Sequence, residues 1–367
     1  MKKRIAIIGA NGQVGSEVCL LLGLMDNIEV VPVCRTEIGS AFLRRCGLPV
    51  RHARAGDPVA MREVLAGCDL VADFSLPTGS ASEVRAAMRQ VIPSLAAAAP
   101  AGAPYVYLSS ITAFGLPDFH SELKNYWFSR NMYGACKRFG ERLVFRSALQ
   151  NGRPGYVLRV GVVHGELQAV TRKTLQTVRT AGDRLTSIPD AESYSVFAFS
   201  IAEALVNIAH GREKPGLYTM LSNPGWRWQD LHEWYCRRAG VAPRIALLKA
   251  DPQPAAWKRA ALAVMTPVQR LVFSSKDIIA SYLTAASPAI ENQFRAVYHT
   301  RNATREIAAG RRDSQYRPYG NNHSVFPGQR LGSLSDSRVT MEPFAQQVRQ
   351  LLKRALDGEL ESVRGKR

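Results

Sequence analysis

The sequence of 367 residues has no closely paired cysteines and no long apolar run. None of its six cysteines stands in a C-x-x-C pair and its histidines are scattered, so neither a zinc site nor a disulfide framework is expected. We predict no metal ion. Apolar residues never continue for the roughly 18 positions that a membrane-spanning helix needs, so no spanning helix is expected either.

The first residues, MKKRIAIIGANGQVG, have the basic start of a secretory signal but not its apolar core. The apolar run IAII is too short, and glycines and polar residues come directly after it. We therefore expect these residues to be part of the folded protein and expect the protein to be cytoplasmic.

Acidic residues are also in short supply, because 30 Asp and Glu face 48 Lys and Arg and leave a net charge of +18. Such a charge attracts nucleic acids, anionic membrane surfaces or small anionic molecules. No zinc-finger, RNA-recognition or helix-turn-helix signature accompanies it, so nucleic acid is not predicted as a partner. A small, anionic substrate is the partner that we expect.

Strand-like and helix-like segments alternate through the first 160 residues. Short β-prone runs occupy residues 4–8, 28–35, 68–76 and 104–110, and helical segments follow them, including an alanine-rich one that contains Pro93. This alternation predicts an α/β fold with a doubly wound parallel sheet covered by helices on both faces.

A glycine-rich loop, GANGQVG, lies between the first strand and the first helix. Gly9 permits a sharp turn, Gly12 lets the backbone approach a diphosphate, and Gly15 lets the helix pack closely on the sheet. The helix N-terminus then offers free N–H groups to phosphates. The loop residues predicted to contact a dinucleotide are Gly9, Asn11, Gly12, Gln13, Val14 and Gly15.

The residue after the second strand indicates which dinucleotide binds. Folds that prefer NAD usually carry an acidic residue there for the ribose hydroxyl. Here the strand ends VVPVCRT and places Arg35 near that position, with no acidic residue before Glu37. Because a guanidinium suits a 2′-phosphate, we favour NADP(H) over NAD(H).

Together with GANGQVG, the motifs AGDPVAMREVLAGCDLV, YLSSITAFG, YGACK and YVLRVGVVHG resemble the short-chain dehydrogenase/reductase superfamily. The resemblance is to its extended branch of sugar-nucleotide epimerases, dehydratases and reductases, and it covers about residues 1–240. It implies a Rossmann-type fold, a nicotinamide cofactor and a nucleotide-sugar-like substrate.

The resemblance also implies roles for single residues. Tyr133 would be the catalytic acid or base, Lys137 would hold the nicotinamide ribose, and Ser110 would orient the substrate oxygen, with Ser109 as the alternative serine. Further cofactor contacts would come from Asp57, Ser75 and Leu76.

Tyr133 and Lys137 are four residues apart, so a helix would place them on one face. A cation near the phenol would lower its pKa towards neutrality, where a proton donor is useful. We therefore expect Lys137 to lower the pKa of Tyr133.

Three functions stay open at this stage. We favour an NADPH-dependent reductase of a carbonyl group. The alternatives are a nucleotide-sugar epimerase that retains NAD, and a non-catalytic NADP-binding regulatory or assembly protein. Dehydration is disfavoured, because Ile111 and Thr112 stand where dehydratases of the branch carry Asp and Glu.

The sequence predicts three regions: a dinucleotide-binding Rossmann domain over 1–164, a smaller mixed substrate-binding portion over 165–254, and a helical, arginine-rich extension over 255–367. Some segments of the second region are expected to return to the sheet. Two partners stay open besides the substrate. One is a membrane surface, contacted by the extension, for instance through AAWKRAALAVMTPVQRLVF. The other is a second copy of the chain in a homodimer.

Overall fold

The central sheet has seven parallel strands in the order β10-β6-β5-β4-β1-β2-β3. The computed structural model describes residues 2–114, 132–182, 184–248 and 328–364, and a few positions between 287 and 300. The strands of the sheet are β1 Lys3–Ile8, β2 Ile28–Cys34, β3 Arg51–His52, β4 Leu70–Asp73, β5 Tyr105–Ser110, β6 Gly155–Val160 and β10 Gly216–Met220. The predicted α/β fold is confirmed.

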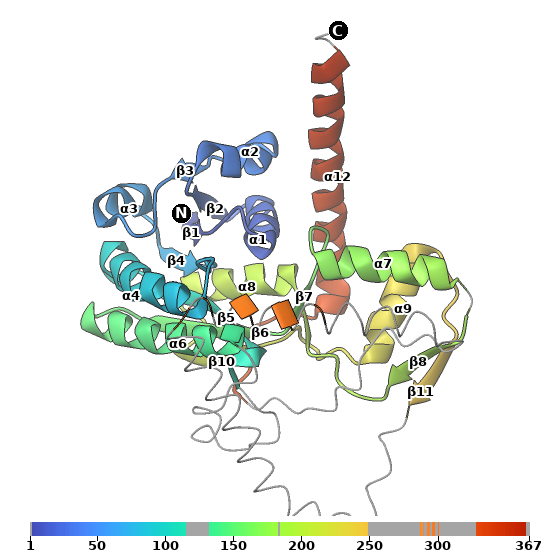
Figure 1. Ribbon diagram of the computed structural model, residues 1–367. Helices are drawn as coiled ribbons and strands as arrows, with labels where there is room; N and C mark the ends of the chain where they lie inside the picture. Colours follow the sequence, from blue (N-terminus) through green and yellow to red (C-terminus); the bar gives the residue numbers. More distant parts are fainter. Residues whose placement is uncertain are drawn as a thin grey trace, which may run out of the picture.

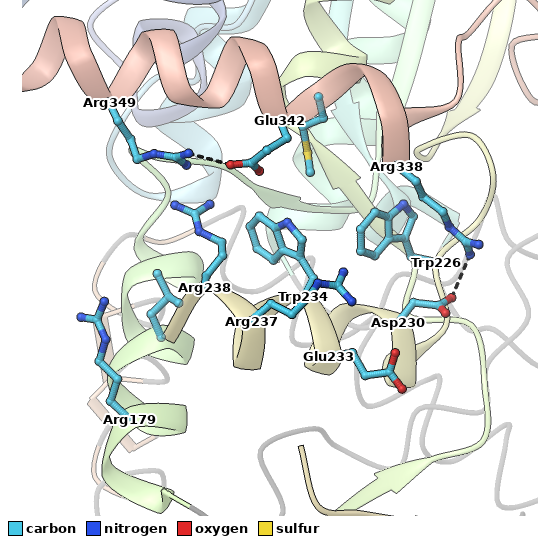
Figure 2. A pocket seen from close by; sticks show the side chains of 12 residues that line it. Arg179, Trp226, Asp230, Glu233, Trp234, Arg237, Arg238, Arg338, Glu342 and Arg349 are labelled. Carbon is cyan, nitrogen blue, oxygen red and sulfur yellow. Dashed lines mark hydrogen bonds and ion pairs between the residues drawn. The ribbon is translucent and has the colours of Figure 1, made fainter. Parts of the chain in front are cut away.

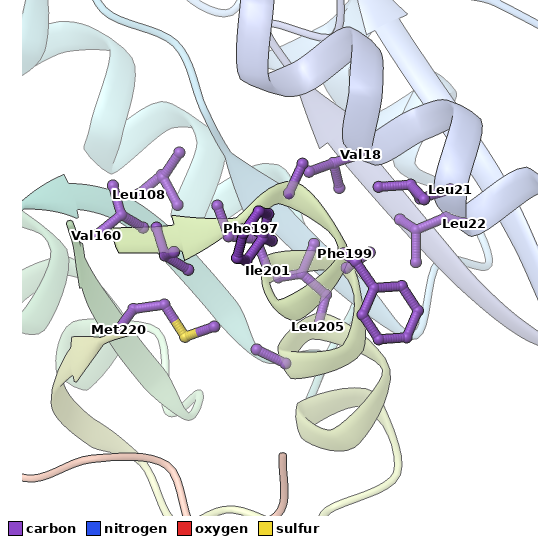
Figure 3. Close-up of a cluster of buried hydrophobic side chains, with 14 of the residues drawn as sticks. Val18, Leu21, Leu22, Leu108, Val160, Phe197, Phe199, Ile201, Leu205 and Met220 are labelled. Atoms are coloured by element: carbon purple, nitrogen blue, oxygen red, sulfur yellow. The ribbon is translucent and has the colours of Figure 1, made fainter. Parts of the chain in front are cut away.

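Helices cover both faces of this sheet (Figure 1). One face carries α3, α4 and α6, and the other carries α1, α2 and α8. Their bounds are α1 Gln13–Gly23, α2 Glu37–Arg45, α3 Pro58–Leu65, α4 Ala81–Ala98, α6 Met132–Gln150 and α8 Ala198–Ala209. Figure 3 shows apolar side chains of α1 and α8, such as Leu22 and Ile201, in one buried cluster with the strand residues Leu108 and Val160.

Local signals in the sequence explain where these helices begin. Ser80 and Glu83 form a reciprocal capping box at the start of α4, and this helix continues through Pro93 as predicted. The Asp57 carboxylate accepts hydrogen bonds from the backbone of α3, and Pro58 occupies the first turn of that helix.

A smaller group of elements lies beside the sheet. It contains β7 Val162–His164 paired with β9 Ser195–Phe197, β8 Thr186–Pro189 paired with β11 Ile245–Leu248, and the helices α7 Ala169–Ala181 and α9 Trp228–Ala239. Between them in sequence, α8 and β10 return to the main sheet, so the two parts of the fold interleave along the chain.

The last helix, α12 Ser337–Arg364, packs its first turns against α8 and α1 and then extends away from the fold (Figure 1). It lies in the extension that the sequence predicts to be helical. The segment AAWKRAALAVMTPVQRLVF, the candidate for contact with a membrane surface, lies outside the described residues.

Candidate functional site

The glycine loop forms a tight turn at the carboxyl end of β1. Gly9 has φ +76°, and a Cβ at this position would lie 3.0 Å from the backbone of Ser75. A Cβ on Gly15 would lie 2.5 Å from the carbonyl oxygen of Gly9, which is closer than side chains approach. Glycine is therefore required at both positions, for the turn and for the packing of α1 on the sheet.

A cavity of about 650 Å³ opens beside this loop, where the strand order changes direction. Six of the predicted cofactor residues line it: Gly9, Asn11, Gly12, Arg35, Ser75 and Leu76. The residues lining the cavity include two arginines, Arg35 and Arg54, and no Asp or Glu. The cavity therefore suits a phosphate-bearing ligand, and the glycine loop leaves room for its diphosphate.

The remaining predicted cofactor residues do not line this cavity. Val14 packs against the hydrophobic core, and Gly15 lies under the loop. Gln13 donates a hydrogen bond to the carbonyl oxygen of Leu167. The Asp57 carboxylate accepts hydrogen bonds from the first turn of α3, so its contact with adenine stays a prediction.

The structure brings Ser110, Tyr133 and Lys137 together at the carboxyl end of β5 and the start of α6. The Ser110 hydroxyl oxygen accepts hydrogen bonds from the Thr112 backbone N–H at 3.3 Å and from the Thr112 hydroxyl at 3.0 Å. It also interacts with the Tyr133 hydroxyl. Tyr133 is 44% exposed, whereas Lys137 is buried with its Nζ 5.9 Å from the centre of the Tyr133 ring.

The expected effect of Lys137 on Tyr133 was wrong for this structure. Partial burial of the phenol raises the pKa of Tyr133 above its ordinary value, while the hydrogen bond with Ser110 acts in the opposite direction. Lys137 instead donates a hydrogen bond to the Leu108 carbonyl oxygen at 2.7 Å. Its own pKa falls to about 8 because the amine is buried, although nearby Asp73 and Glu141 favour the charged form.

Asp73 connects Lys137 to the cavity and was missed from the sequence. Its buried carboxylate accepts hydrogen bonds from the Ser75 N–H at 2.9 Å, the Ser75 hydroxyl at 2.6 Å and the Tyr105 hydroxyl at 3.1 Å. Ser75 lines the cavity, and the Asp73 carboxylate that holds it also acts electrostatically on the buried amine of Lys137. The polar residue at the end of the apolar run LVADFS was the available signal.

Ser109 points to the opposite side of the strand from Ser110, into a buried ion pair. Its hydroxyl donates to the Glu141 carboxylate at 2.5 Å, and Arg159 donates to the same carboxylate at 2.9 Å and 2.7 Å. This network occupies Ser109, so the geometry favours Ser110 as the serine that faces a substrate. Sequence reasoning missed Glu141 as well, which stands four residues after Lys137 in the helix.

The environment of His164 indicates a structural role. His164 is buried, its Nδ1 lies 2.6 Å from the Tyr235 hydroxyl, and burial lowers its pKa to about 3. Among the described residues, no group of three or more His, Cys, Asp or Glu is placed to hold a metal ion. None of the helices in the described part of the chain is both long and apolar enough to cross a membrane.

The structure thus has a cavity beside the glycine loop and a separate group of Ser110, Tyr133 and Lys137, none of which lines that cavity. The model of the NAD dependent epimerase/dehydratase family matches residues 5–191. The chain belongs to this family. Its members are enzymes that use a nicotinamide cofactor, so the resemblance to extended short-chain dehydrogenases/reductases is confirmed.

Solved structures of the family share the fold at low sequence identity. The UDP-N-acetylglucosamine 4-epimerase from Bacillus cereus is 15% identical with a TM-score of 0.51, and the match covers 68% of this chain and 86% of that one. The UDP-glucuronic acid 4-epimerase from Bacillus cereus, solved with UDP-glucuronic acid and NAD, is 14% identical with a TM-score of 0.50 and covers 68% and 87%. A search of curated proteins found no match.

Proposed function

We propose that this family member is an NADPH-dependent reductase of a carbonyl group on a nucleotide-sugar-like or other small anionic substrate. The observation that carries the choice of cofactor is the cavity lining, with Arg35 and Arg54 and no carboxylate. Guanidinium groups bind a 2′-phosphate, whereas a carboxylate would repel it.

We propose roles for three side chains, as the family resemblance implies, and the contact between Ser110 and Tyr133 supports them. NADPH, when bound, would supply a hydride for the substrate carbonyl carbon. The Tyr133 hydroxyl donates the proton that the carbonyl oxygen takes up, and the Ser110 hydroxyl orients that oxygen. We propose that Lys137 binds the nicotinamide ribose; its amine donates a hydrogen bond to the Leu108 carbonyl oxygen and interacts electrostatically with Asp73.

An epimerase that retains NAD is the alternative with specific support. The two structural neighbours named above are UDP-sugar 4-epimerases, and one was solved with NAD. Such an enzyme would take a hydride from the substrate and return it to the other face. A non-catalytic NADP-binding protein is the third candidate, although it would need none of Ser110, Tyr133 and Lys137.

The first experiment identifies the cofactor. The purified protein is denatured, any released nucleotide is identified by mass spectrometry, and empty protein is titrated with NADPH and NADH. We expect an empty site that prefers NADPH. The Arg35→Gln variant should lose about tenfold or more in NADPH affinity, because a charge-assisted hydrogen bond is lost, and should keep its NADH affinity. Arg44→Gln, on the neighbouring helix α2 and outside the cavity, is the matched control.

Equal losses of NADPH and NADH affinity in Arg35→Gln would remove the argument for NADP. Tightly retained NAD in the purified protein would favour the epimerase instead.

A second experiment tests the proton donor. Tyr133→Phe should reduce turnover by at least about a hundredfold, within the range that general acid catalysis contributes, and should leave cofactor affinity within about threefold. Full activity of this variant with an accepted substrate would show that another group donates the proton.

A further inference from the structure

A second and larger cavity, of about 820 Å³, lies between α7, α9 and α12 (Figure 2). We call it the arginine groove, because five arginines line it: Arg179, Arg237, Arg238, Arg338 and Arg349. It shares no lining residue with the cofactor cavity, and neither Ser110 nor Tyr133 lines it.

Three of these arginines are fixed in place by carboxylates. Arg238 and Arg349 both pair with Glu166, at 2.7 Å and 2.9 Å, and Arg349 also pairs with Glu342 at 2.6 Å. The side chain of Glu166 is only 9% exposed, so this cluster of ion pairs is shielded from solvent on one side. The guanidinium groups are therefore held in position before any ligand arrives.

Arg338 is fixed in the same way at the other end of the groove. It pairs with Asp230 at 3.1 Å, as Figure 2 shows, and its guanidinium lies 5.8 Å from the centre of the Trp226 ring. Arg238 lies 4.7 Å from the centre of the Trp234 ring. Both tryptophans are buried, so they form a rigid apolar wall behind the arginines.

The other two arginines have open donors. Within the described part of the chain, Arg179 on α7 and Arg237 on α9 form no ion pair with a carboxylate, and both are exposed at the groove. The lining carboxylates Asp230 and Glu342 are already engaged by arginines, and Glu233 accepts a hydrogen bond from Gln229. The neutral Gln229 amide leaves the charge of Glu233 in place, so five arginines face four carboxylates, those of Glu166, Asp230, Glu233 and Glu342. The groove thus presents a small excess of positive charge.

We propose that the arginine groove binds a small phosphate-bearing molecule at a site separate from the cofactor cavity and from Ser110 and Tyr133. Guanidinium groups present paired N–H donors that match phosphate oxygens, and the fixed arginines lower the cost of ordering the site. A volume of about 820 Å³ lies in the range of sites that hold whole small ligands. Arg179 and Arg237 contact the phosphate, and the tryptophan wall supports the neighbouring guanidinium groups of Arg238 and Arg338.

Calorimetric titration of the full-length protein with inorganic pyrophosphate tests this site. The titration is repeated with saturating NADPH, because pyrophosphate can also enter a dinucleotide cavity. The test variant is Arg179→Gln with Arg237→Gln. The control is Arg62→Gln with Arg146→Gln, which makes the same change in net charge at exposed positions outside both cavities.

We expect pyrophosphate to bind the wild-type protein with NADPH present and absent. The test variant should bind at least about tenfold more weakly, because two charge-assisted hydrogen bonds are lost, and the control should stay within about twofold of wild type. No binding to the wild type would overturn the proposal, as would complete competition by NADPH or an equal loss in both double variants. None of these outcomes depends on whether the protein is a reductase or an epimerase.

Discussion

The buried pair of Glu141 and Arg159 supports the strand that carries Ser110, and its removal gives a sharp stability prediction. Arg159 donates two hydrogen bonds to the Glu141 carboxylate, and the two side chains are only 10% (Arg159) and 5% (Glu141) exposed. Ser109 donates a third hydrogen bond to the same carboxylate. The pair therefore joins α6, β5 and β6 directly beside the proposed catalytic residues.

Glu141→Gln removes the negative charge and leaves the Arg159 guanidinium buried without compensation. Breaking a buried pair in this way costs about 3–5 kcal/mol of unfolding free energy. For a chain of this size, about 4 kcal/mol corresponds to a fall of roughly 5 °C in Tm. Thermal unfolding followed by circular dichroism measures the change. The Arg159 guanidinium also lies 4.3 Å from the centre of the Phe114 ring, so Arg159→Met should destabilise at least as strongly.

The double variant Glu141→Met with Arg159→Met separates charge from packing. With both charges gone, no unpaired charge stays buried, so we expect the double variant to be more stable than the sum of the single losses predicts. A fall of less than about 2 °C for Glu141→Gln would refute the reasoning. Losses that simply add in the double variant would refute it as well.

Two further predictions concern the glycine loop and the helix behind it. Gly15→Ala should destabilise the protein by about 1–3 kcal/mol and weaken dinucleotide binding, because the new Cβ would lie 2.5 Å from the Gly9 carbonyl oxygen. Thermal unfolding and cofactor titration measure the two effects. The control is Gly332→Ala, where a Cβ meets nothing within 4 Å. Burial raises the pKa of Glu17 from 4.5 to about 7. Between these two pH values the folded protein keeps a proton that the unfolded chain has released. The unfolding free energy should therefore fall by about 3 kcal/mol as the pH rises from 4.5 to about 7. Unfolding curves of wild type and Glu17→Gln between about pH 4.5 and pH 8 measure this slope, and an equal slope in both proteins would contradict the assignment to Glu17.

The sequence could predict the fold and the glycine-loop turn at the edge of the sheet, because these depend on local patterns. Alternating apolar runs specify strands and helices, and parallel strands bring their carboxyl ends to one edge of the sheet. Gly9, Arg35, Ser75 and Ser110 each follow or end such a strand, so their gathering at that edge follows from their positions in the chain. The turn at Gly9 and the close packing at Gly15 follow from glycine alone, since no other residue fits there.

Only the tertiary structure decided how the polar groups around the site interact. The position of the Lys137 amine depends on Leu108 and Asp73, which lie on other elements, so spacing within one helix led to the wrong direction for the pKa of Tyr133. The arginine groove is a stronger case, because Arg349 and Glu166 are 183 positions apart and meet only when α12 packs onto the fold. Periodicity and motifs act over a few residues, whereas burial and charge pairing depend on which distant side chains the fold brings into contact.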